Sequence, residues 1–425
     1  MTPGDLLTLD IERPVAGGRM LARHEGRVVL VAGAIPGERV TARVARVAKG
    51  VAHAETVDVL TASSDRRPAE DWRCGGRDYA HVAYERQRAL KGEIIADAFR
   101  RLARLPLPSP PGVQASPEQG YRLRARLHAA GGRLGFFREG THALCEVEGT
   151  GQLSPGTIGW IRHAERALAP AAAATIAGVD IAENIPETER TAHVEIRGAV
   201  ERGAWAPLTD GLTGLSVQAE RGETITIAGT PTVTDRLPVT GTAGAAEVVL
   251  SRHTTAFFQA NRFLLPWLLQ HVVGLVRDGA LLDLYAGVGL FGLAAAAAGQ
   301  GPVTLVEGDR TSGADLEANA GPFSGRVRLL RRSVEAAVGS RLGEFATCIV
   351  DPPRAGLSPE ARTGVLRLSP GRIVYVSCDV ATLARDARVL VDGGYVLGDI
   401  TGVDLFPSTA HVETVAVFDR VSPDP

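Results

Sequence analysis

Cysteine is scarce in this chain of 425 residues, which holds only Cys74, Cys145, Cys348 and Cys378. So few cysteines exclude a disulfide-stapled scaffold and favour a reducing cytoplasm as the location. Long apolar runs are also missing: the best candidate for a membrane span, LLDLYAGVGLFGLAAAAAG, is interrupted by Asp283 and by glycines. The first residues, MTPGDLLTLDIERP, lack the apolar stretch of a secretory signal. We therefore expect a cytoplasmic protein with no membrane contact.

Lysine is nearly absent, at positions 49 and 91 only, so arginine carries almost all of the positive charge. Arginine suits bidentate contacts with phosphate, but its abundance could equally reflect a compositional bias towards Arg, Ala and Gly. The net charge of −2 provides no global basic field, so RNA binding would need a local patch. One candidate is YRLRARLHAA, where Arg122, Arg124 and Arg126 would share one face of a strand. A solvated strand face without RNA contact is the alternative.

The length predicts two or three domains, and the sequence pattern divides the chain into three. Residues 1–62 contain five short strand-like runs between turn residues, which is typical of a small β-barrel. Residues 63–254 are mostly β, with a helical pattern at about 82–105, whose packing on the next domain is left open, and a further helix expected in RALAPAAAATIAGV. In residues 255–425 strands and helices alternate, which predicts a doubly wound α/β sheet. Its last two strand-like runs have no helix between them and should form an antiparallel hairpin.

The first turn of the α/β region, LDLYAGVGLFG, has Gly287, Gly289 and Gly292 in the spacing G-x-G-x-x-G. Glycines allow a tight turn and let a ligand approach the backbone beside a helix N-terminus. Glu307 ends the next strand in VEGD, where a carboxylate can bind the ribose hydroxyls of a nucleotide ligand. The pattern fits NAD and S-adenosylmethionine alike, and a tight turn without a ligand is the remaining alternative.

Three further polar residues are expected at the same edge of the sheet. Asp351 ends the fourth strand in VDPPRAG, and Cys378 ends the fifth in VYVSCDV, directly before a helix. Ligands bind outside the carboxyl ends of parallel strands, next to the glycine turn. Glu413 opens the final strand in HVETV, and an antiparallel strand begins at the edge where its parallel neighbours end. Glu413 should therefore face the same crevice as Cys378.

A cysteine, a carboxylate and a methyl donor together suit methyl transfer to carbon 5 of uracil. A thiolate that adds to carbon 6 makes carbon 5 nucleophilic, and a base later removes the proton from carbon 5 so that the thiol leaves. We assign the nucleophile to Cys378, helped by the adjacent helix N-terminus, and the base to Glu413. The alternatives are a buried core cysteine, the role that we assign to Cys348, and a surface carboxylate.

These motifs resemble the family of S-adenosylmethionine-dependent RNA (uracil-5-)methyltransferases, along the whole chain and in its ribosomal-RNA branch. The resemblance implies a TRAM barrel at 1–62, a central RNA-binding domain at 63–254 and a Rossmann-like methyltransferase domain at 255–425. FFQAN resembles the segment in which Gln259 would contact cofactor or base, and LDLYAGVG resembles the cofactor motif with Tyr285 beside the donor. VSCDVATLARD and DLFPSTAHVETV resemble the motifs of the nucleophile and the base. The implied S-adenosylmethionine site contains no metal and comprises Gln259, Tyr285, Gly287, Gly289, Glu307 and Asp351.

The resemblance implies an enzyme that methylates one uridine in RNA, with 23S rRNA favoured and the transfer-RNA T-loop as the alternative. We expect a monomer. The chain departs from the family at Asp379 and Val380, where Asn-Pro is usual, and at Leu290 and Ser333, where asparagine occurs. A carboxylate at position 379 would tend to raise the pKa of the neighbouring thiol. A changed base or position and a non-catalytic RNA-binding protein therefore stay open. A nicotinamide-dependent dehydrogenase also stays open, because it would share the glycine turn.

Many ribosomal-RNA members of this family hold an iron–sulfur cluster with four cysteines. DWRCGGRDYAHV resembles that segment, with Cys74 retained and Arg77 where another ligand is expected. Cys145 is the distant partner that remains, and two cysteines cannot hold a four-thiolate cluster. We expect no cluster, and we expect Cys74 and Cys145 to lie close together.

Overall fold

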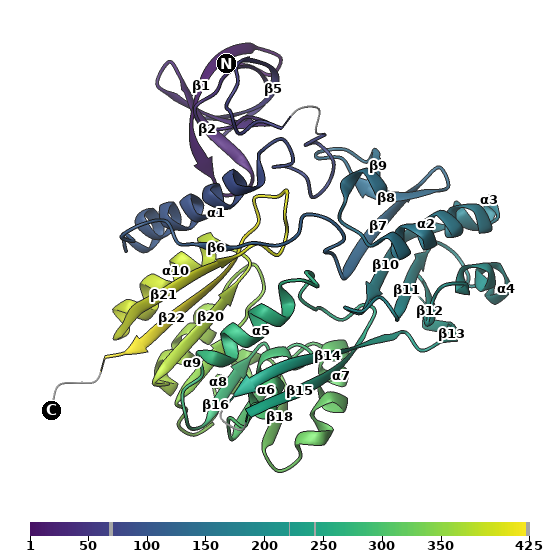
Figure 1. Cartoon of the computed structure of the whole chain (residues 1–425), viewed down its shortest axis with the longest axis vertical. Helices are drawn as coiled ribbons and strands as arrows, with labels where there is room; N and C mark the ends of the chain where they lie inside the picture. Colours follow the sequence, from purple (N-terminus) through teal and green to yellow (C-terminus); the bar gives the residue numbers. More distant parts are fainter. Residues whose placement is uncertain (68–70, 221, 242–243, 422–425) are drawn as a thin grey trace.

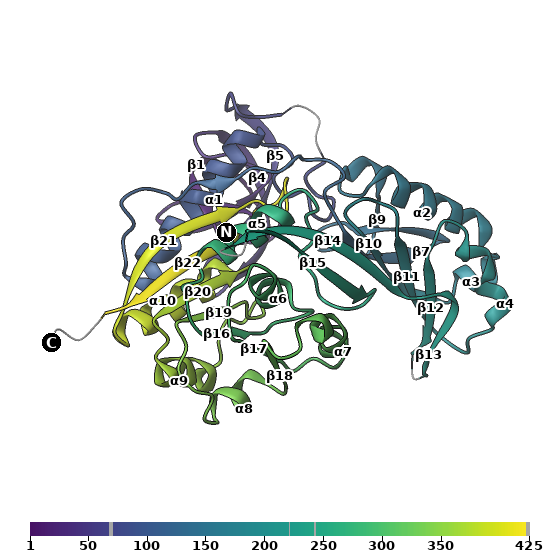
Figure 2. The same ribbon diagram turned by 60° about the horizontal axis from the view of Figure 1, so that its bottom comes forward.

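Three lobes meet around the middle of the molecule in the computed structural model (Figure 1). The structure describes residues 1–67, 71–220, 222–241 and 244–421. A barrel forms the first lobe, a mostly β lobe follows it, and an α/β lobe contains the C-terminal part of the chain (Figure 2). No helix within these ranges is long and apolar enough to cross a membrane.

The N-terminal lobe is a closed barrel with the strand order β1-β2-β3-β5-β4. Side chains alternate along the first strand, so that Leu7, Leu9 and Ile11 are buried in the barrel core while their neighbours face solvent. Antiparallel pairing of the first strand with the fourth closes the barrel. The prediction of a five-stranded barrel is confirmed. The strands are β1 (Leu6–Val15), β2 (Arg19–His24), β3 (Arg27–Ala32), β4 (Arg39–Ala48) and β5 (Val51–Thr61).

A long helix lies between the barrel and the α/β lobe (Figure 1). It comprises α1 (Tyr84–Ala98) and continues as the π-helix η1 (Phe99–Ala103), close to the helix predicted at about 82–105. Ile95 and Phe99 are buried in an apolar core that they share with the last sheet. The other side of α1 contacts β1. This helix therefore joins the barrel to the α/β lobe.

The central lobe is a seven-stranded sheet in the order β13-β12-β11-β10-β7-β8-β9. Trp160 and Ile161 of its longest helix pack into the core of this sheet. The strands are β7 (Arg124–Ala130), β8 (Arg133–Phe137), β9 (Leu144–Glu146), β10 (Ile176–Glu183), β11 (Arg190–Ile196), β12 (Gly214–Ala219) and β13 (Thr224–Gly229). The helical segments are η2 (Glu148–Thr150), α2 (Pro155–Ala167), α3 (Pro170–Ala173), α4 (Arg202–Trp205) and η3 (Ala206–Thr209).

The helix expected in RALAPAAAATIAGV is wrong in its second half. Helix α3 ends at Ala173, and β10 begins at Ile176. Val179 and Ile181 are buried, and β10 pairs antiparallel with β7 on one side and β11 on the other. Burial of β-branched residues and pairing on both sides outweigh the helix propensity of the alanines.

A hairpin of β14 (Thr232–Gly241) and β15 (Gly244–His253) connects the central lobe to the α/β lobe. Its buried residues Leu237, Val248 and Leu250 belong to the same apolar core as the helices α5 and α6 of the α/β lobe. The hairpin therefore packs with the α/β lobe, although it precedes residue 255.

The α/β lobe is an eight-stranded sheet in the order β18-β17-β16-β19-β20-β22-β21-β6. The short strand β6, from the segment after α1, adds to the outer edge parallel to β21 and was not predicted. The strands of this sheet are β6 (Val113–Gln114), β16 (Leu281–Leu284), β17 (Val303–Glu307), β18 (Val327–Arg331), β19 (Thr347–Val350), β20 (Arg372–Ser377), β21 (Tyr395–Val403) and β22 (Glu413–Arg420). The helical segments are α5 (Leu265–Gly274), α6 (Leu290–Ala297), α7 (Arg310–Ala320), η4 (Gly321–Phe323), α8 (Val334–Val338), α9 (Pro359–Leu368) and α10 (Val380–Asp392).

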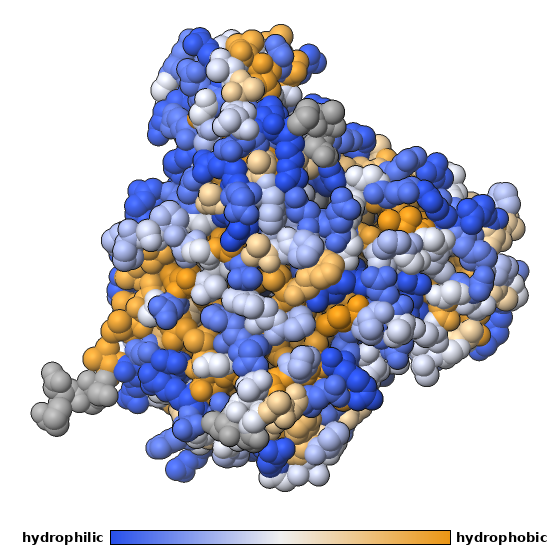
Figure 3. Space-filling model, in the orientation of Figure 1, coloured by the Kyte–Doolittle hydropathy of each residue, from blue (hydrophilic) through white to orange (hydrophobic). Residues whose placement is uncertain are grey.

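Helices cover both faces of this sheet, as predicted for a doubly wound fold. Leu281 of β16 faces the core that contains α5 and α6, while Leu282 and Leu284 face the core that contains α9 and α10. The final strand β22 is antiparallel to both β20 and β21, so the predicted terminal hairpin is confirmed. Apolar side chains reach the surface over these last strands (Figure 3), where Val396 of β21 is exposed.

Candidate active site

The glycine turn joins β16 to α6 and begins at Tyr285, a half-buried residue whose φ is +63°. At Gly289, which precedes α6, φ is +100° and a Cβ would lie 2.4 Å from the Leu293 side chain. Only glycine fits this position without strain. A Cβ at Gly287 would meet nothing within 4 Å, so this part of the turn is open to a ligand.

Two carboxyl groups hold the turn. Glu307 accepts hydrogen bonds from the Gly287 N–H at 2.8 Å and from the Asp309 N–H at 2.6 Å. Asp283, which the sequence analysis noted only as a break in an apolar run, accepts a bond from the Gly292 N–H at 2.8 Å. Burial raises the pKa of Asp283 to about 8. Its carboxyl group is therefore mostly protonated at neutral pH.

Gln259 and Asp351 meet next to the turn. The Asp351 N–H donates to the carbonyl of Leu284, one residue before the turn begins, and Gln259 Nε2 donates to Asp351 Oδ2 at 3.3 Å. Burial raises the pKa of Asp351 to about 7, while the bond from Gln259 lowers it. The structure thus brings Gln259, Tyr285 and Asp351 to the glycine turn, where the sequence analysis expected them.

Cys378 and Glu413 come from neighbouring antiparallel strands. Ser377 pairs with Thr414 across β20 and β22. The same register makes Cys378 and Glu413 the next two residues along, so they lie opposite each other at the end of the ladder. Glu413 is buried, and its Oε1 has no hydrogen-bond partner among the residues that the structure describes.

The electrostatics of this pair favour a protonated thiol in the resting site. Burial raises the pKa of Cys378 to about 11, and the negative charges of Glu413 and Asp351 add to this, whereas Arg354 lowers it. Burial and repulsion from Asp351 also raise the pKa of Glu413 well above its ordinary value. Asp351 and Glu413 together therefore carry fewer than two negative charges at neutral pH.

The residues that depart from the family pattern have structural roles. Asp379 is the N-cap of α10, and its side chain accepts a hydrogen bond from the Thr382 N–H at 2.9 Å. Asp379 is not among the main causes of the raised thiol pKa, contrary to the expectation from sequence. Val380 and Leu290 are buried in apolar cores, and Ser333 caps α8.

The loop that leads to Glu413 is held from outside the α/β lobe. Lys91 of α1 forms a buried ion pair with Asp404 and also donates to the Phe406 carbonyl at 3.1 Å. Gln87 accepts a bond from the Ser408 N–H at 2.8 Å, and Asp78 accepts one from the Ala410 N–H at 3.0 Å. None of these residues was predicted from the sequence. The available signal was a rare lysine between the apolar residues Leu90 and Ile94 of a predicted helix. The residues that tie down this loop are Asp78, Gln87 and Lys91.

Replacing Lys91 by methionine should lower the free energy of unfolding by about 3–5 kcal/mol, because the fully buried Asp404 loses its partner. Urea titration of the full chain, followed by circular dichroism, measures this. The double variant Lys91→Met, Asp404→Leu should recover most of the loss, since no buried charge remains. Equal instability of the single and double variants would contradict the importance of the ion pair.

A cavity of about 470 Å³ lies against Cys378. It is lined by Arg354, Cys378 and Asp379 of the α/β lobe, and also by residues of the other two lobes. Arg354 is exposed, and its guanidinium group has no hydrogen bond or ion pair with any residue that the structure describes. No role for Arg354 was predicted from the sequence. Its positive charge lowers the pKa of both Cys378 and Glu413.

The predicted arginine stripe is largely occupied within the protein. Arg122 precedes β7 and donates to Gln152 at 2.5 Å, and Arg126 forms ion pairs with Asp180 and Glu195. Arg124 lies with its guanidinium 5.8 Å from the centre of the Phe257 ring. The arrangement does not support a continuous row of phosphate contacts.

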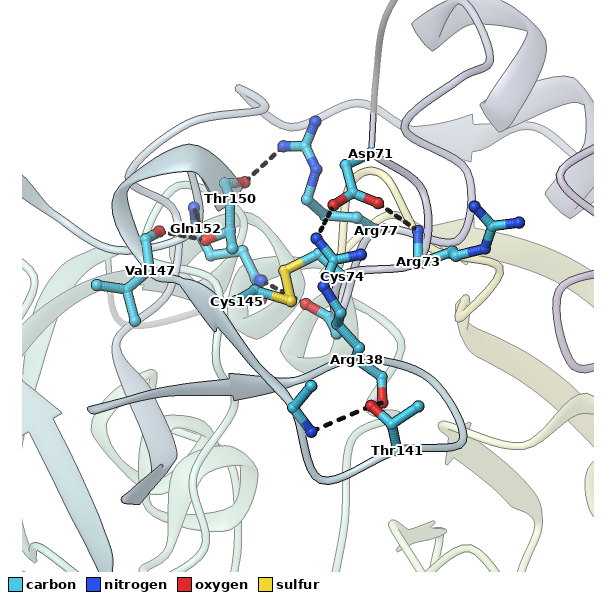
Figure 4. The surroundings of a disulfide bond; sticks show 12 residues. Asp71, Arg73, Cys74, Arg77, Arg138, Thr141, Cys145, Val147, Thr150 and Gln152 are labelled. Atoms are coloured by element: carbon cyan, nitrogen blue, oxygen red, sulfur yellow. Dashed lines mark hydrogen bonds and ion pairs between the residues drawn. A yellow bond between two sulfur atoms is a disulfide. The ribbon is translucent and has the colours of Figure 1, made fainter. Parts of the chain in front are cut away.

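Cys74 and Cys145 form a disulfide with their Cα atoms 5.8 Å apart (Figure 4). The sequence analysis expected the two residues to lie close together but did not predict the bond. Arg77 donates to the Thr150 carbonyl at 2.9 Å beside it. With both sulfurs in a disulfide, neither offers a thiolate to an iron–sulfur cluster, so these residues do not fit such a cofactor. Within the described ranges, no group of three or more His, Cys, Asp or Glu residues could hold a metal ion.

The chain thus combines a small barrel with a doubly wound sheet, in which a cysteine and a carboxylate lie at the same edge as a glycine turn. Residues 2–57 match the TRAM domain, and residues 326–421 match the family described as tRNA (Uracil-5-)-methyltransferase. An uncharacterized RNA methyltransferase of Corynebacterium efficiens is 31% identical over 99% of this chain and 96% of its own. The chain belongs to the RNA (uracil-5-)methyltransferase family.

Relatives with more specific names are equally similar. The 23S rRNA (uracil(1939)-C(5))-methyltransferase RlmD of Pseudomonas putida is 31% identical, with 97% of this chain and 93% of the relative covered. Among solved structures, the tRNA (uracil-54, C5)-methyltransferase of Pyrococcus abyssi, in complex with S-adenosyl-L-homocysteine, has a TM-score of 0.76. The match covers 97% of this chain and 100% of the Pyrococcus chain, and 23% of the residues are identical, so this likeness concerns the fold.

Proposed function

We propose that this protein transfers a methyl group from S-adenosylmethionine to carbon 5 of a uridine in 23S rRNA, through a covalent bond between Cys378 and carbon 6. The observation that carries the proposal is the position of Cys378, directly after β20, next to Glu413, which begins β22, at the edge of the sheet that holds the glycine turn. The relatives named RlmD support ribosomal RNA as the substrate. We further propose that the protein acts as a monomer in the cytoplasm.

The residues at the turn fit S-adenosylmethionine. Gly287 leaves open space above the turn, and the Glu307 carboxylate next to it has the chemistry to bind both ribose hydroxyls. Gln259, Tyr285, Gly289 and Asp351 would complete the site. When bound, the cofactor supplies an electrophilic methyl group.

Cys378 begins the reaction. The raised thiol pKa means that the thiol must first lose its proton to solvent, and the positive charge of Arg354 stabilises the thiolate. The sulfur then bonds to carbon 6, and the electron pair of the 5,6 double bond moves towards carbon 5 and the carbonyl oxygen at carbon 4. Carbon 5 thereby becomes the nucleophile that accepts the methyl group.

Glu413 ends the reaction. After the methyl group is in place, the Glu413 carboxylate removes the proton from carbon 5. The electron pair of that bond restores the double bond, and the Cys378 sulfur leaves as a thiolate. Burial makes Glu413 a stronger base than an ordinary carboxylate. The uridine must leave its stack to reach the half-buried Cys378 and the buried Glu413. Unstacking costs a few kcal/mol and is least costly for an unpaired base, which favours a uridine in a loop as the target.

Methyl transfer to transcripts of 23S rRNA and of transfer RNA tests this function. With labelled S-adenosylmethionine, we expect 5-methyluridine at one position of 23S rRNA, mapped by mass spectrometry of nuclease fragments. Methylation of the transfer-RNA T-loop instead would replace ribosomal RNA by the alternative substrate. The absence of 5-methyluridine from both RNAs, with the purified protein still able to bind them, would contradict methyl transfer and favour a non-catalytic RNA-binding role.

A further inference from the structure

The cavity beside Cys378 extends well beyond the reacting atoms. Besides the α/β lobe, it is lined by the barrel turn that contains Gly17, Gly18 and Arg19, and by Phe137 and Glu139 of the central lobe. None of the described residues assigned to the cofactor lines it. A volume of about 470 Å³ lies in the range of cavities that hold drug-sized ligands, which are larger than one pyrimidine. The target uracil therefore leaves part of this cavity empty.

An aromatic ring is fixed in the wall of this remaining space. Phe137, at the end of β8, stacks on His128 with the ring centres 3.7 Å apart and the planes within 7°. His142 meets the Phe137 ring edge-on at 5.2 Å. These contacts hold the ring in place while it lines the cavity. A ring held in this way on one face by His128 can offer its opposite face to an unpaired base.

A charged pair from two lobes lines the same cavity as Phe137. Arg19 of the barrel donates to Glu139 at 2.8 Å and to the Ala54 carbonyl at 3.3 Å. The Glu139 N–H donates to the Arg73 carbonyl at 2.9 Å, which fixes its backbone. Because Glu139 neutralises Arg19, the pair does not favour a phosphate group. The half-exposed Glu139 carboxylate keeps acceptor positions for N–H donors.

We propose that the part of the cavity between the barrel turn and Phe137 binds a second, unpaired nucleobase, from a nucleotide close to the target uridine in the RNA. The base stacks on Phe137, and its N–H groups donate to Glu139. This inference rests on the proposed function, because it assumes that Cys378 receives the target base. It makes the contact between the barrel and the central lobe a determinant of RNA sequence preference.

Coupling between Phe137 and individual RNA bases tests the proposal. The probe is the shortest 23S rRNA fragment that the protein methylates, with 5-fluorouridine at the target and an abasic ribose at one of three positions on either side. Fluorine cannot leave as a proton, so the rate of the trapped adduct reports on binding and addition. We expect Phe137→Ala to slow adduct formation roughly tenfold. We expect one abasic position to do the same and the two changes together to add nothing further.

The controls separate this proposal from the proposed function. Phe137→Leu keeps an apolar side chain without an aromatic face. If the fold is intact, it should slow adduct formation as Phe137→Ala does, with no further loss at the same abasic position. Phe323→Ala removes a half-buried ring outside the cavity and should leave the adduct rate unchanged. Glu139→Gln should alter which base is preferred at the coupled position. If the rate reductions caused by Phe137→Ala and by the abasic change multiply at all six positions, the two changes act independently. That result would overturn the second base site. A complete lack of adduct with the wild-type protein would overturn the proposed function, and the inference with it.

Discussion

Replacing Cys378 by alanine is expected to abolish both methyl transfer and the covalent bond to RNA. Removal of a nucleophile that works together with its base typically costs 10⁴-fold or more, so we expect a loss of about this size. RNA that contains 5-fluorouracil traps the adduct, which then migrates with the protein in a denaturing gel. Wild-type protein with S-adenosylmethionine should give this band, and the Cys378→Ala protein should not.

The second free cysteine provides the control. Cys348 lies fully buried in β19, within the core that contains α9 and α10. Cys348→Ala should still form the adduct, because this thiol does not reach the cavity. An adduct formed by Cys378→Ala would contradict the assignment of the nucleophile. So would its loss in Cys348→Ala protein that keeps the wild-type circular dichroism spectrum.

The pH dependence of adduct formation checks the state of the thiol. With a pKa of about 11, Cys378 stays mostly protonated between about pH 6 and pH 9, and its thiolate fraction rises about tenfold per pH unit. The adduct rate should rise with pH over this range. At each pH in this range, Arg354→Met should react more slowly than the wild-type protein, since the variant lacks the charge that lowers the pKa of Cys378. A flat profile would mean that the thiolate already exists in the resting protein.

The meeting of Cys378 and Glu413 was predictable, because it depends on rules of topology. A strand-ending cysteine, a final strand without a preceding crossover helix and the antiparallel direction of that strand together place both residues at one edge. The glycine turn, Glu307 and Asp351 follow from the same rule. The observed register of β20 and β22 ends with the pair Ser377 and Thr414, so the two residues are the next ones along at the end of the ladder.

The residues that complete the site from other lobes were not predictable in this way. Lys91 meets Asp404 across 313 positions of the chain, and Phe137 approaches Cys378 only because separate sheets pack together. No local pattern determines how lobes dock. Asp379 is different: an aspartate just before a helix is a common N-cap, so its role could have been inferred from sequence. The alternation of side chains along β7 also does not reveal that Asp180 and Glu195, from neighbouring strands, pair with Arg126.

Replacing Glu413 by glutamine is expected to stop the reaction after methyl transfer. The variant keeps the thiol of Cys378 and removes a negative neighbour that raises the thiol pKa, so addition to carbon 6 should proceed. Without the base, the proton on carbon 5 stays and the sulfur cannot leave. Turnover should fall by about 10²–10⁴-fold. Methylated, covalently bound RNA should accumulate even with ordinary uridine, measurable by labelled methyl groups in the protein–RNA band.

Asp351 is the other buried carboxyl group near Cys378, and the two can be distinguished. Asp351 already accepts a hydrogen bond from Gln259, whereas Glu413 Oε1 has no partner within the described part of the chain and is free to take a proton. Asp351→Asn should therefore slow the reaction without trapping methylated RNA, because the base is still present. If Asp351→Asn traps the methylated adduct and Glu413→Gln turns over normally, the base is Asp351. Glu413 would then act only by raising the pKa of the Cys378 thiol.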